Sequence, residues 1–284
     1  MHAPALLRSL GRVAGLFFLV TVPVACFLSL DRLLLFPTRG PAGHAGAERR
    51  TLPFRDGELE LWTARSRPAA TSGGRADLYV LRFYGNADRA DPHVGPEADA
   101  LWPRRDTVLW GVNYPGYGGS DGAARLESVG PAALAAYDAL RAEAGPDRPI
   151  LVFGTSLGTT AALHVAAQRP DVAGLILQNP PPIRQMILRG YGWWNLWLLA
   201  GPLAAHVPAA LDSVRNAGAV RCKAVFLLAE DDEVVAPKYQ RLLAGAYAGE
   251  KRVVILAGAR HNSPVEGQAL EDFERGVDWL LQPR

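Results

Sequence analysis

The chain has 284 residues, of which 49% are hydrophobic and 20% are charged, so it has enough apolar side chain for a sizeable core in one large or two small domains. This composition excludes a wholly disordered chain. The 30 Lys and Arg against 28 Asp and Glu leave a net charge of +2, which does not indicate a nucleic-acid-binding protein. With 2 cysteines and no Cys-x-x-Cys, the chain has neither a disulfide framework nor a zinc motif.

Residues 1–36 predict an N-terminal membrane anchor. Arg12 and Asp31 bracket eighteen uncharged residues, which is the lower limit for a transmembrane helix. A cleaved signal peptide is the alternative, but this run exceeds the usual apolar region of roughly 7–15 residues, and Pro23 is unfavourable beside the best cleavage point. A buried core helix would show an amphipathic face, and none is visible. We therefore expect an uncleaved single-pass anchor.

The charges around this run specify its orientation weakly, because arginines lie on both sides and long domains cross a membrane largely regardless of them. We expect the N-terminus in the cytoplasm and the bulk of the chain on the extracytoplasmic side. Residues 37–50 are rich in Gly, Pro and Ala and predict a linker. Residues 51–284 show neither an internal repeat nor a further boundary, so they form one predicted domain.

Short apolar runs alternate with helical segments along this domain. The predicted strands are residues 58–62, 77–83, 107–112, 149–153, 174–177, 224–228 and 252–256. The predicted helices are residues 131–144, 157–169, 237–248 and 265–281. Several strands are continuously apolar, which is typical of a parallel sheet covered on both faces. The sequence therefore predicts an α/β domain with a mostly parallel sheet and helices on both faces.

The best candidate nucleophile is Ser156. Residues 154–158 read Gly-Thr-Ser-Leu-Gly, which matches the G-x-S-x-G pattern between a strand and a helix. The pattern needs a turn so tight that only glycine fits at its two ends, and it exposes the serine at a helix N-terminus. A glycine- and serine-rich helix cap would show the same letters without this role.

A serine hydroxyl needs a base that takes its proton, and His261 is the best of the six histidines. It follows the last predicted strand in a short turn, at the carboxyl edge of the sheet where Ser156 also lies. The orienting acid is expected after the preceding strand, within the carboxylate run 230–233. We predict Asp232, with Asp231 as the alternative. The order Ser156, Asp232, His261 is that of the α/β-hydrolases.

These features together resemble the α/β-hydrolase superfamily. Within it, residues 33–284 resemble the membrane-anchored Bem46-like group, which is related to the mammalian α/β-hydrolase domain 13 and 17 proteins. The landmarks, in chain order, are Leu-Leu-Leu-Phe-Pro at 33–37, Tyr-Gly-Asn-Ala at 84–87, Asn-Tyr-Pro-Gly-Tyr-Gly-Gly-Ser-Asp-Gly at 113–122, the Ser156 turn, and the Asp232–His261 pair.

The resemblance implies an oxyanion hole made by the backbone N–H groups of Leu157 and Asn86. Tyr84 stands where the group usually has histidine, and we expect its side chain to shape the substrate pocket. Asn113 and Pro115 replace an aspartate and an arginine, which removes a charge pair beside the site.

Residues 179–222 lie where such folds insert a lid-like segment. Trp193 and Trp197 in this insert share helical spacing, which predicts an amphipathic core helix. The functional alternative is that both tryptophans bind substrate in an acyl pocket or lie at the membrane interface.

The sequence therefore predicts a membrane-anchored serine hydrolase that cleaves carboxylic esters or thioesters through an acyl-enzyme, on small-molecule or acylated substrates. It implies no metal or organic cofactor and no nucleic acid, and it leaves the oligomeric state open. A serine peptidase or amidase would use the same triad, and a non-catalytic scaffold with this fold is the remaining alternative.

Overall fold

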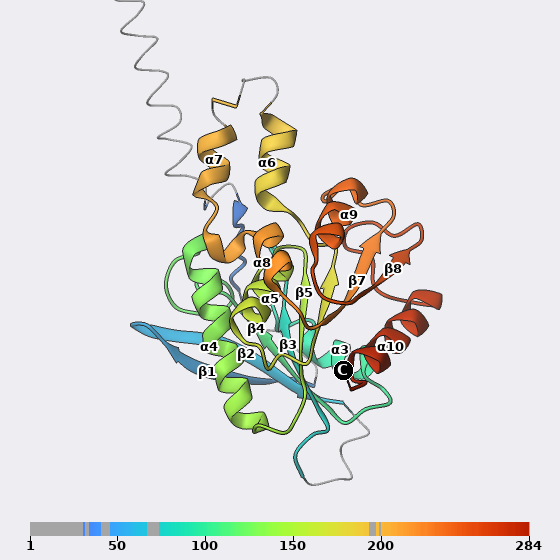
Figure 1. Ribbon diagram of the computed structural model, residues 1–284. Coiled ribbons are helices and arrows are strands. Elements are labelled where there is room, and N and C mark those ends of the chain that lie inside the picture. Colours follow the sequence, from blue (N-terminus) through green and yellow to red (C-terminus); the bar gives the residue numbers. More distant parts are fainter. Residues whose placement is uncertain are drawn as a thin grey trace, which may run out of the picture.

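An eight-stranded sheet forms the centre of the computed structural model, which describes residues 31, 34–40, 46–66, 74–192, 197–198 and 200–283 (Figure 1). The strands are β1 (Glu48–Phe54), β2 (Gly57–Arg65), β3 (Leu78–Phe83), β4 (Thr107–Val112), β5 (Ile150–Thr155), β6 (Gly174–Gln178), β7 (Lys223–Ala229) and β8 (Lys251–Leu256). Their order is β1-β2-β4-β3-β5-β6-β7-β8. Only the β1–β2 and β2–β4 pairs are antiparallel, so the predicted mostly parallel sheet is confirmed.

Helices cover both faces of the sheet because its strands are apolar on both sides. Val152 and Phe226 pack on the face covered by α4 (Leu126–Ala144), α5 (Leu157–Gln168), α8 (Ser213–Ala219) and α9 (Pro237–Ala246). Their strand neighbours Leu151 and Val225 point the other way, onto α3 (Val94–Leu101) and α10 (Gln268–Leu280). This alternation of side chains along each strand gives the domain two apolar layers.

The insert 179–222 contains α6 (Ile183–Tyr191), α7 (Ala200–His206) and a short 3-10 helix (Ala209–Leu211) before α8. In Figure 1, α6 and α7 lie side by side beyond the carboxyl ends of the strands. Ile183 and Ile187 of α6 belong to the same buried apolar cluster as Leu157, at the start of α5.

The strand order reverses direction between β3 and β5, which are neighbours in the sheet although β4 lies between them in the chain. Open α/β sheets bind ligands at such a switch point, outside the carboxyl ends of the strands. The residues that follow β3 and β5 include Asn86 and Ser156, so the topology brings both to this edge.

The seven strands and the four helices predicted from the alternating apolar runs are present, with bounds that differ mostly by one or two residues. The helix predicted around Trp197 is not, because Trp197 lies in a turn. Strand β1 was not predicted, and it begins at Glu48, inside the range assigned to a linker. The helix predicted from Pro131 begins at Leu126, because the proline ring removes only one helical N–H and the helix continues through it. Helices α3, α6, α7 and α8 were not predicted either.

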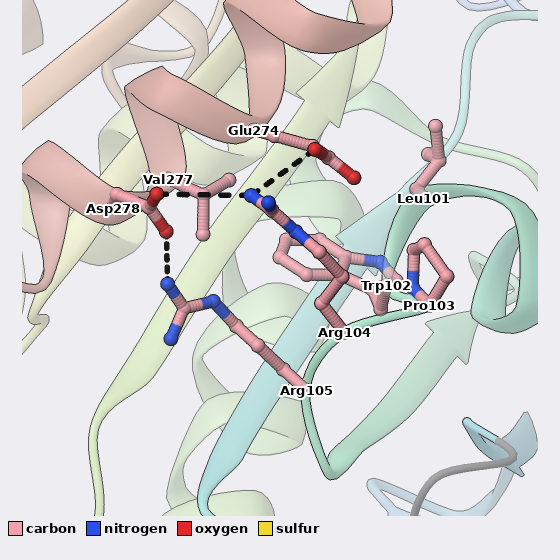
Figure 2. A pocket seen from close by; sticks show the side chains of 8 residues that line it. All are labelled: Leu101, Trp102, Pro103, Arg104, Arg105, Glu274, Val277 and Asp278. Atoms are coloured by element: carbon pink, nitrogen blue, oxygen red, sulfur yellow. Dashed lines mark hydrogen bonds and ion pairs between the residues drawn. The ribbon is translucent and has the colours of Figure 1, made fainter.

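A small cavity lies at the opposite, amino edge of the sheet, between the chain before β4 and helix α10 (Figure 2). Its volume of about 20 Å³ has room for roughly one water molecule. Arg104 pairs with Glu274 at 3.1 Å, and Arg105 pairs with Asp278. These contacts join the loop to α10, and the cavity is too small for a substrate.

A buried carboxylate, Glu60, holds the 113–122 loop at the carboxyl edge of the sheet. Glu60 Oε2 accepts hydrogen bonds from Asn113 Nδ2 and the Gly119 N–H, both at 2.7 Å, and Oε1 accepts one from Arg49 at 2.6 Å. Burial by itself would raise the pKa of Glu60, but these donors outweigh it, so the pKa lies below its ordinary value of 4.5. The carboxylate of Glu60, which belongs to β2, therefore places a negative charge beside the neutral side chain of Asn113.

Replacing Glu60 with glutamine is expected to make the free energy of unfolding fall less steeply as the pH is lowered. Because the folded-state pKa of Glu60 is lowered, its contribution to the free energy of unfolding is present above pH 4.5 and is lost as the pH falls through the folded-state pKa. Thermal unfolding followed between about pH 5 and pH 3 should show a steeper loss for the wild type than for Glu60→Gln. Glu58→Gln, an exposed change in the same strand, is the control. Parallel curves for wild type and Glu60→Gln would contradict this prediction.

Candidate active site

Ser156 occupies a strained turn between β5 and α5. Its backbone angles are φ 50° and ψ −122°, in a region that a non-glycine residue rarely adopts. A Cβ atom on Gly154 would lie 2.4 Å from the Gly158 carbonyl oxygen, and one on Gly158 would lie 2.2 Å from the Phe83 carbonyl oxygen. Glycine is therefore required at both positions, and the turn exposes the Ser156 hydroxyl at the carboxyl edge of the sheet.

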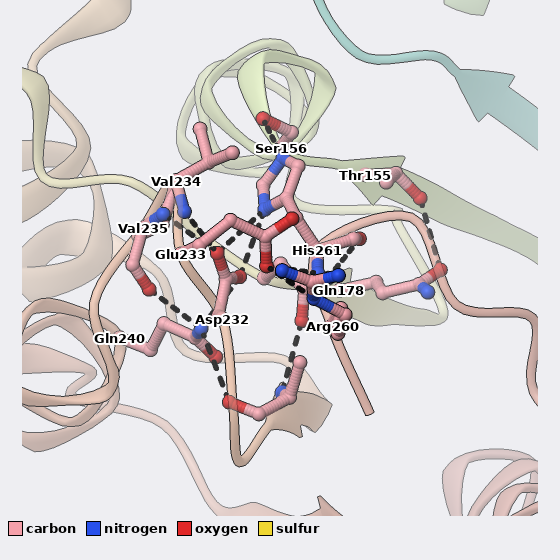
Figure 3. Close-up of polar contacts among 12 residues, drawn as sticks. Thr155, Ser156, Gln178, Asp232, Glu233, Val234, Val235, Gln240, Arg260 and His261 are labelled. Carbon is pink, nitrogen blue, oxygen red and sulfur yellow. Dashed lines mark hydrogen bonds and ion pairs between the residues drawn. The ribbon is translucent and has the colours of Figure 1, made fainter. Parts of the chain in front are cut away.

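The structure brings Ser156, His261 and Asp232 into one hydrogen-bonded chain (Figure 3). Ser156 Oγ lies 3.0 Å from His261 Nε2, and His261 Nδ1 lies 2.8 Å from Asp232 Oδ2. An ionised carboxylate only accepts hydrogen bonds, so a neutral His261 carries its proton on Nδ1. Its Nε2 lone pair then faces the Ser156 hydroxyl.

Asp232 is buried, with 5% of its surface exposed, and it accepts hydrogen bonds on both oxygens. The N–H groups of Val234 and Val235 donate to Oδ1 at 2.8 and 2.7 Å, and Gln240 Nε2 donates to Oδ2 at 2.8 Å. These donors compensate the buried charge and orient the carboxylate towards His261. Asp231, the alternative acid, is exposed, and its backbone N–H donates to the Ala259 carbonyl.

Other carboxylates of the run 230–233 hold the turn that carries His261. Glu230 Oε2 accepts from the Gly258 N–H at 3.1 Å, and Glu233 Oε2 accepts from the His261 N–H at 3.3 Å. Hydrogen bonds from the backbone N–H groups of Glu233 itself and of His261, together with the nearby Arg260, lower the pKa of Glu233. Both glutamates are exposed residues, and the groups that they bind lie 28 residues further along the chain.

Asn179, which the sequence analysis missed as a site residue, connects the two loops of the acid and the base. It is fully buried directly after β6, and its Nδ2 donates to the His261 carbonyl at 2.7 Å while its Oδ1 accepts from the Ala229 N–H at 3.0 Å. Its φ of 50° is a conformation that asparagine tolerates better than most residues. Its place at the carboxyl end of a strand was the one available signal.

We expect Asn179→Gly to lower the free energy of unfolding by about 1–3 kcal/mol and to lower kcat as well. Glycine keeps the positive φ but leaves the buried His261 carbonyl and Ala229 N–H without these partners. Chemical denaturation and steady-state ester hydrolysis measure the two effects. Asn262→Gly removes an exposed amide from the same turn and serves as the control. A kcat equal to that of the wild type would show that Asn179 does not position His261.

Leu157 and Asn86, the residues predicted to supply the oxyanion donors, follow Ser156 and Gly85 respectively in the chain. Leu157 is the first residue of α5, so its N–H has no partner within the helix. Gly85 precedes Asn86, and a Cβ on Gly85 would lie 3.4 Å from Ser156 Cβ. The loop after β3 therefore packs directly against the candidate nucleophile.

The Tyr84 side chain was predicted to contact the substrate, but it is buried in the domain. Its side chain is only 2% exposed, and its hydroxyl donates to Glu97 Oε2 at 3.1 Å. Burial, together with the Glu97 carboxylate, raises the pKa of Tyr84 well above its ordinary value. The same carboxylate pairs with Arg82 at 2.9 Å, so Tyr84 is part of a buried polar cluster.

Arg82, at the end of β3, fastens this cluster to the turn of Ser156. Its Nη1 donates to Thr155 Oγ1 at 2.9 Å and to the Phe83 carbonyl at 3.1 Å. Thr155 Oγ1 in turn donates to Gln178 Oε1 at 3.1 Å. The ends of β3, β5 and β6 are thus connected by side chains as well as by the sheet.

Trp197 and Leu198 lie in a turn between α6 and α7, not in the predicted core helix. Trp197 is 52% exposed, and its Nε1 donates to the Leu188 carbonyl at the end of α6 at 3.2 Å. Trp193 lies outside the described residues, as does the predicted anchor run 13–30. Among the helices that the structure describes, none has both the length and the apolar character to span a membrane.

Comparison with known proteins identifies the family of this chain. A family model for the alpha/beta hydrolase fold matches residues 104–200, a range that includes Ser156. An uncharacterised protein of Mycobacterium tuberculosis is 31% identical over 254 residues, which is 86% of this chain and 85% of that protein. This chain belongs to the α/β-hydrolase fold family.

Solved structures with the α/β-hydrolase fold are similar over most of the chain. The Pyrococcus furiosus esterase Pf2001 has a TM-score of 0.63 and 14% identity, with 87% of this chain and 96% of that chain covered. A puromycin-hydrolyzing peptidase of Mycobacterium tuberculosis has a TM-score of 0.61 and 20% identity, with 82% and 39% covered. At these identities the likeness shows the α/β-hydrolase fold alone, which is known in both esterases and peptidases.

Proposed function

We propose that this α/β-hydrolase is a serine hydrolase that cleaves carboxylic ester or thioester bonds through an acyl-enzyme. The observation that carries the proposal is the contact of 3.0 Å between Ser156 Oγ and His261 Nε2, at a strained strand–turn–helix junction. A serine hydroxyl becomes an effective nucleophile only when a positioned base takes its proton.

The proposed reaction has two stages. Ser156 Oγ attacks the substrate carbonyl carbon while His261 Nε2 takes the hydroxyl proton, and the C–O or C–S bond to the leaving group then breaks as His261 returns that proton to it. Water, activated by the same imidazole, hydrolyses the acyl-enzyme and regenerates Ser156. Asp232 keeps the Nδ1 tautomer and stabilises the imidazolium that forms in each stage.

The N–H groups of Leu157 and Asn86 are the proposed donors to the oxyanion. Two fixed donors aimed at the developing charge commonly supply a large share of the rate, because they need no reorganisation during the reaction. The position of Gly85 against Ser156 and the helix start at Leu157 support this role.

We further propose that residues 13–30 tether the domain to a membrane as a single-pass anchor, with the domain on the extracytoplasmic side, as in the Bem46-like group. The apolar run ends at residue 30, six residues before Phe36. The covalent chain therefore keeps Phe36 within about 20 Å of the end of the run. A tether this short favours acylated or lipid-like substrates.

Probe labelling and a substrate panel test the proposed function on the full-length chain in detergent micelles. A fluorophosphonate probe should label the wild type and not Ser156→Ala, and p-nitrophenyl esters should be hydrolysed faster than matched peptide amides. If the wild type is not labelled, the protein is a non-catalytic scaffold. If peptide amides are hydrolysed faster than esters, the same triad belongs to a peptidase or amidase. Fractionation of membranes from expressing cells tests the anchor.

A further inference from the structure

A segment shortly after the apolar run 13–30 packs against the catalytic edge of the domain. We call residues 34–40 the strap. Leu35 is 3% exposed and belongs to the buried cluster that also contains Tyr117 and Leu157. Asp31, just before the strap, accepts hydrogen bonds from the Leu35 N–H through its carbonyl at 2.7 Å and from the Leu126 N–H through Oδ1 at 2.8 Å. A flexible spacer would make none of these contacts.

Backbone and side-chain hydrogen bonds fasten the strap to the 113–122 loop. The Gly118 N–H donates to the Thr38 carbonyl at 2.9 Å. Arg39 Nε donates to the Gly116 carbonyl at 2.9 Å, and its Nη2 donates to the Gly122 carbonyl at 3.0 Å. The strap is therefore integrated into the domain, although it was predicted to belong to the anchor and the linker.

The side chain of Asn86 connects the strap to the loop that carries the proposed oxyanion donor. Asn86 Oδ1 accepts hydrogen bonds from the Phe36 N–H at 2.8 Å, from the Tyr117 hydroxyl at 3.1 Å and from the Ala87 N–H at 3.0 Å. The first donor belongs to the strap, the second to the 113–122 loop, and the third to the loop of Asn86 itself. One carbonyl oxygen thus holds three segments together.

The conformation of this loop requires such support. Ala87 has a φ of 61°, which is unfavourable for alanine, and the hydrogen bond from its N–H to Asn86 Oδ1 holds it there. Gly85, on the other side of Asn86, packs on Ser156. A rotation of the loop would therefore move the Asn86 N–H relative to the carbonyl that Ser156 attacks.

We propose that Asn86 is a positioning residue whose side chain, held by the strap and Tyr117, fixes its own backbone N–H in the oxyanion hole. The strap is then part of the catalytic framework and not a spacer behind the anchor. This inference rests on the proposed function, because the position of the N–H matters only if an oxyanion forms beside Ser156.

The chemistry of the side chain explains why an amide suits this position. An aspartate would accept the same three hydrogen bonds, but it would place a negative charge in the residue whose N–H stabilises the oxyanion. Like charges repel strongly in a partly dry site, so the transition state would be disfavoured. Asparagine supplies the acceptor without the charge.

Steady-state kinetics of full-length variants with p-nitrophenyl butyrate test the inference. Asn86→Ala keeps the backbone N–H but removes the acceptor, so kcat should fall about 10- to 100-fold, which is less than the roughly 100- to 1,000-fold loss when an oxyanion donor is removed outright, while KM changes less than about twofold. Phe36→Pro removes the N–H that the strap donates to Asn86 Oδ1, along with the exposed phenyl ring, and should lower kcat in the same way. Asn86→Asp should unfold at a temperature near that of the wild type and still lose kcat.

Asn216→Ala is the matched control, because the buried Asn216 of α8 donates a hydrogen bond of 2.8 Å to the Ala210 carbonyl of the 3-10 helix, and alanine removes it. Its kcat should stay at the wild-type value. An Asn86→Ala variant with wild-type kcat, or one whose loss appears only in KM, would overturn the inference.

Hydrogen–deuterium exchange separates failure of this inference from failure of the proposed function. Asn86→Ala and Phe36→Pro should both speed deuterium uptake in the peptide covering residues 84–88, whether or not the wild type hydrolyses esters. Unchanged uptake would overturn the strap's role even in an active enzyme. If the probe does not label the wild type but the variants still show faster uptake, the proposed function is refuted, and with it the catalytic part of the inference. The hydrogen bond between the strap and Asn86 would still be shown to hold the loop.

Discussion

Replacing Ser156 with alanine is expected to lower kcat for ester hydrolysis by about a million-fold, to a residual rate set by binding and the oxyanion donors. Without Oγ no acyl-enzyme forms, and His261 has no hydroxyl to deprotonate. Activity is measured with excess enzyme, and labelling is measured by the fluorophosphonate probe. The reaction and the label should be lost together, because both require the same oxygen.

The control for this prediction is Ser128→Ala, which removes a serine hydroxyl at the start of α4 that contacts Arg55. We expect that variant to keep wild-type labelling and kcat. Residual activity of Ser156→Ala above about one per cent would mean that another group attacks the substrate, because loss of a true nucleophile costs far more. The proposed mechanism would then be wrong although the fold is unchanged.

Asp232→Asn is expected to lower kcat by about ten-thousand-fold with little change in the fold. The asparagine oxygen can still accept from the Val234 and Val235 N–H groups, so the loop keeps its main hydrogen bonds. Its amide group, however, is a donor towards His261 Nδ1, which favours the tautomer with the proton on Nε2. That proton would point at Ser156 and remove the base.

Asp231→Asn is the matched control, because it makes the same chemical change at the adjacent, exposed carboxylate. We expect its kcat to lie within about twofold of the wild-type value, as for most surface substitutions. The pair of variants decides between the two acids that the sequence left open. A large loss in Asp231→Asn with an active Asp232→Asn would reverse the assignment.

The strand–turn–helix around Ser156 was predictable because its determinants are local. Two glycines, one serine, an apolar strand before them and an alanine-rich helix after them specify the turn without reference to the rest of the chain. The parallel sheet was also predictable from local sequence, because strands that are apolar on both sides must be covered by helices on both faces of the sheet. His261 was predictable from its place after the last strand, because parallel strands end at one edge.

The sequence by itself therefore determined the sheet, the turn at residue 156 and the edge at which the candidate triad lies. Only the tertiary structure decided how these side chains are supported. Asn179 bonds the backbone 82 residues away, Arg82 reaches Thr155, and the strap meets Asn86 across 50 residues. Such contacts leave no periodic pattern, because their geometry depends on how the sheet twists and how the loops at its edge pack. From the sequence, Tyr84 was predicted to contact the substrate. In the folded chain its hydroxyl instead donates a hydrogen bond to Glu97.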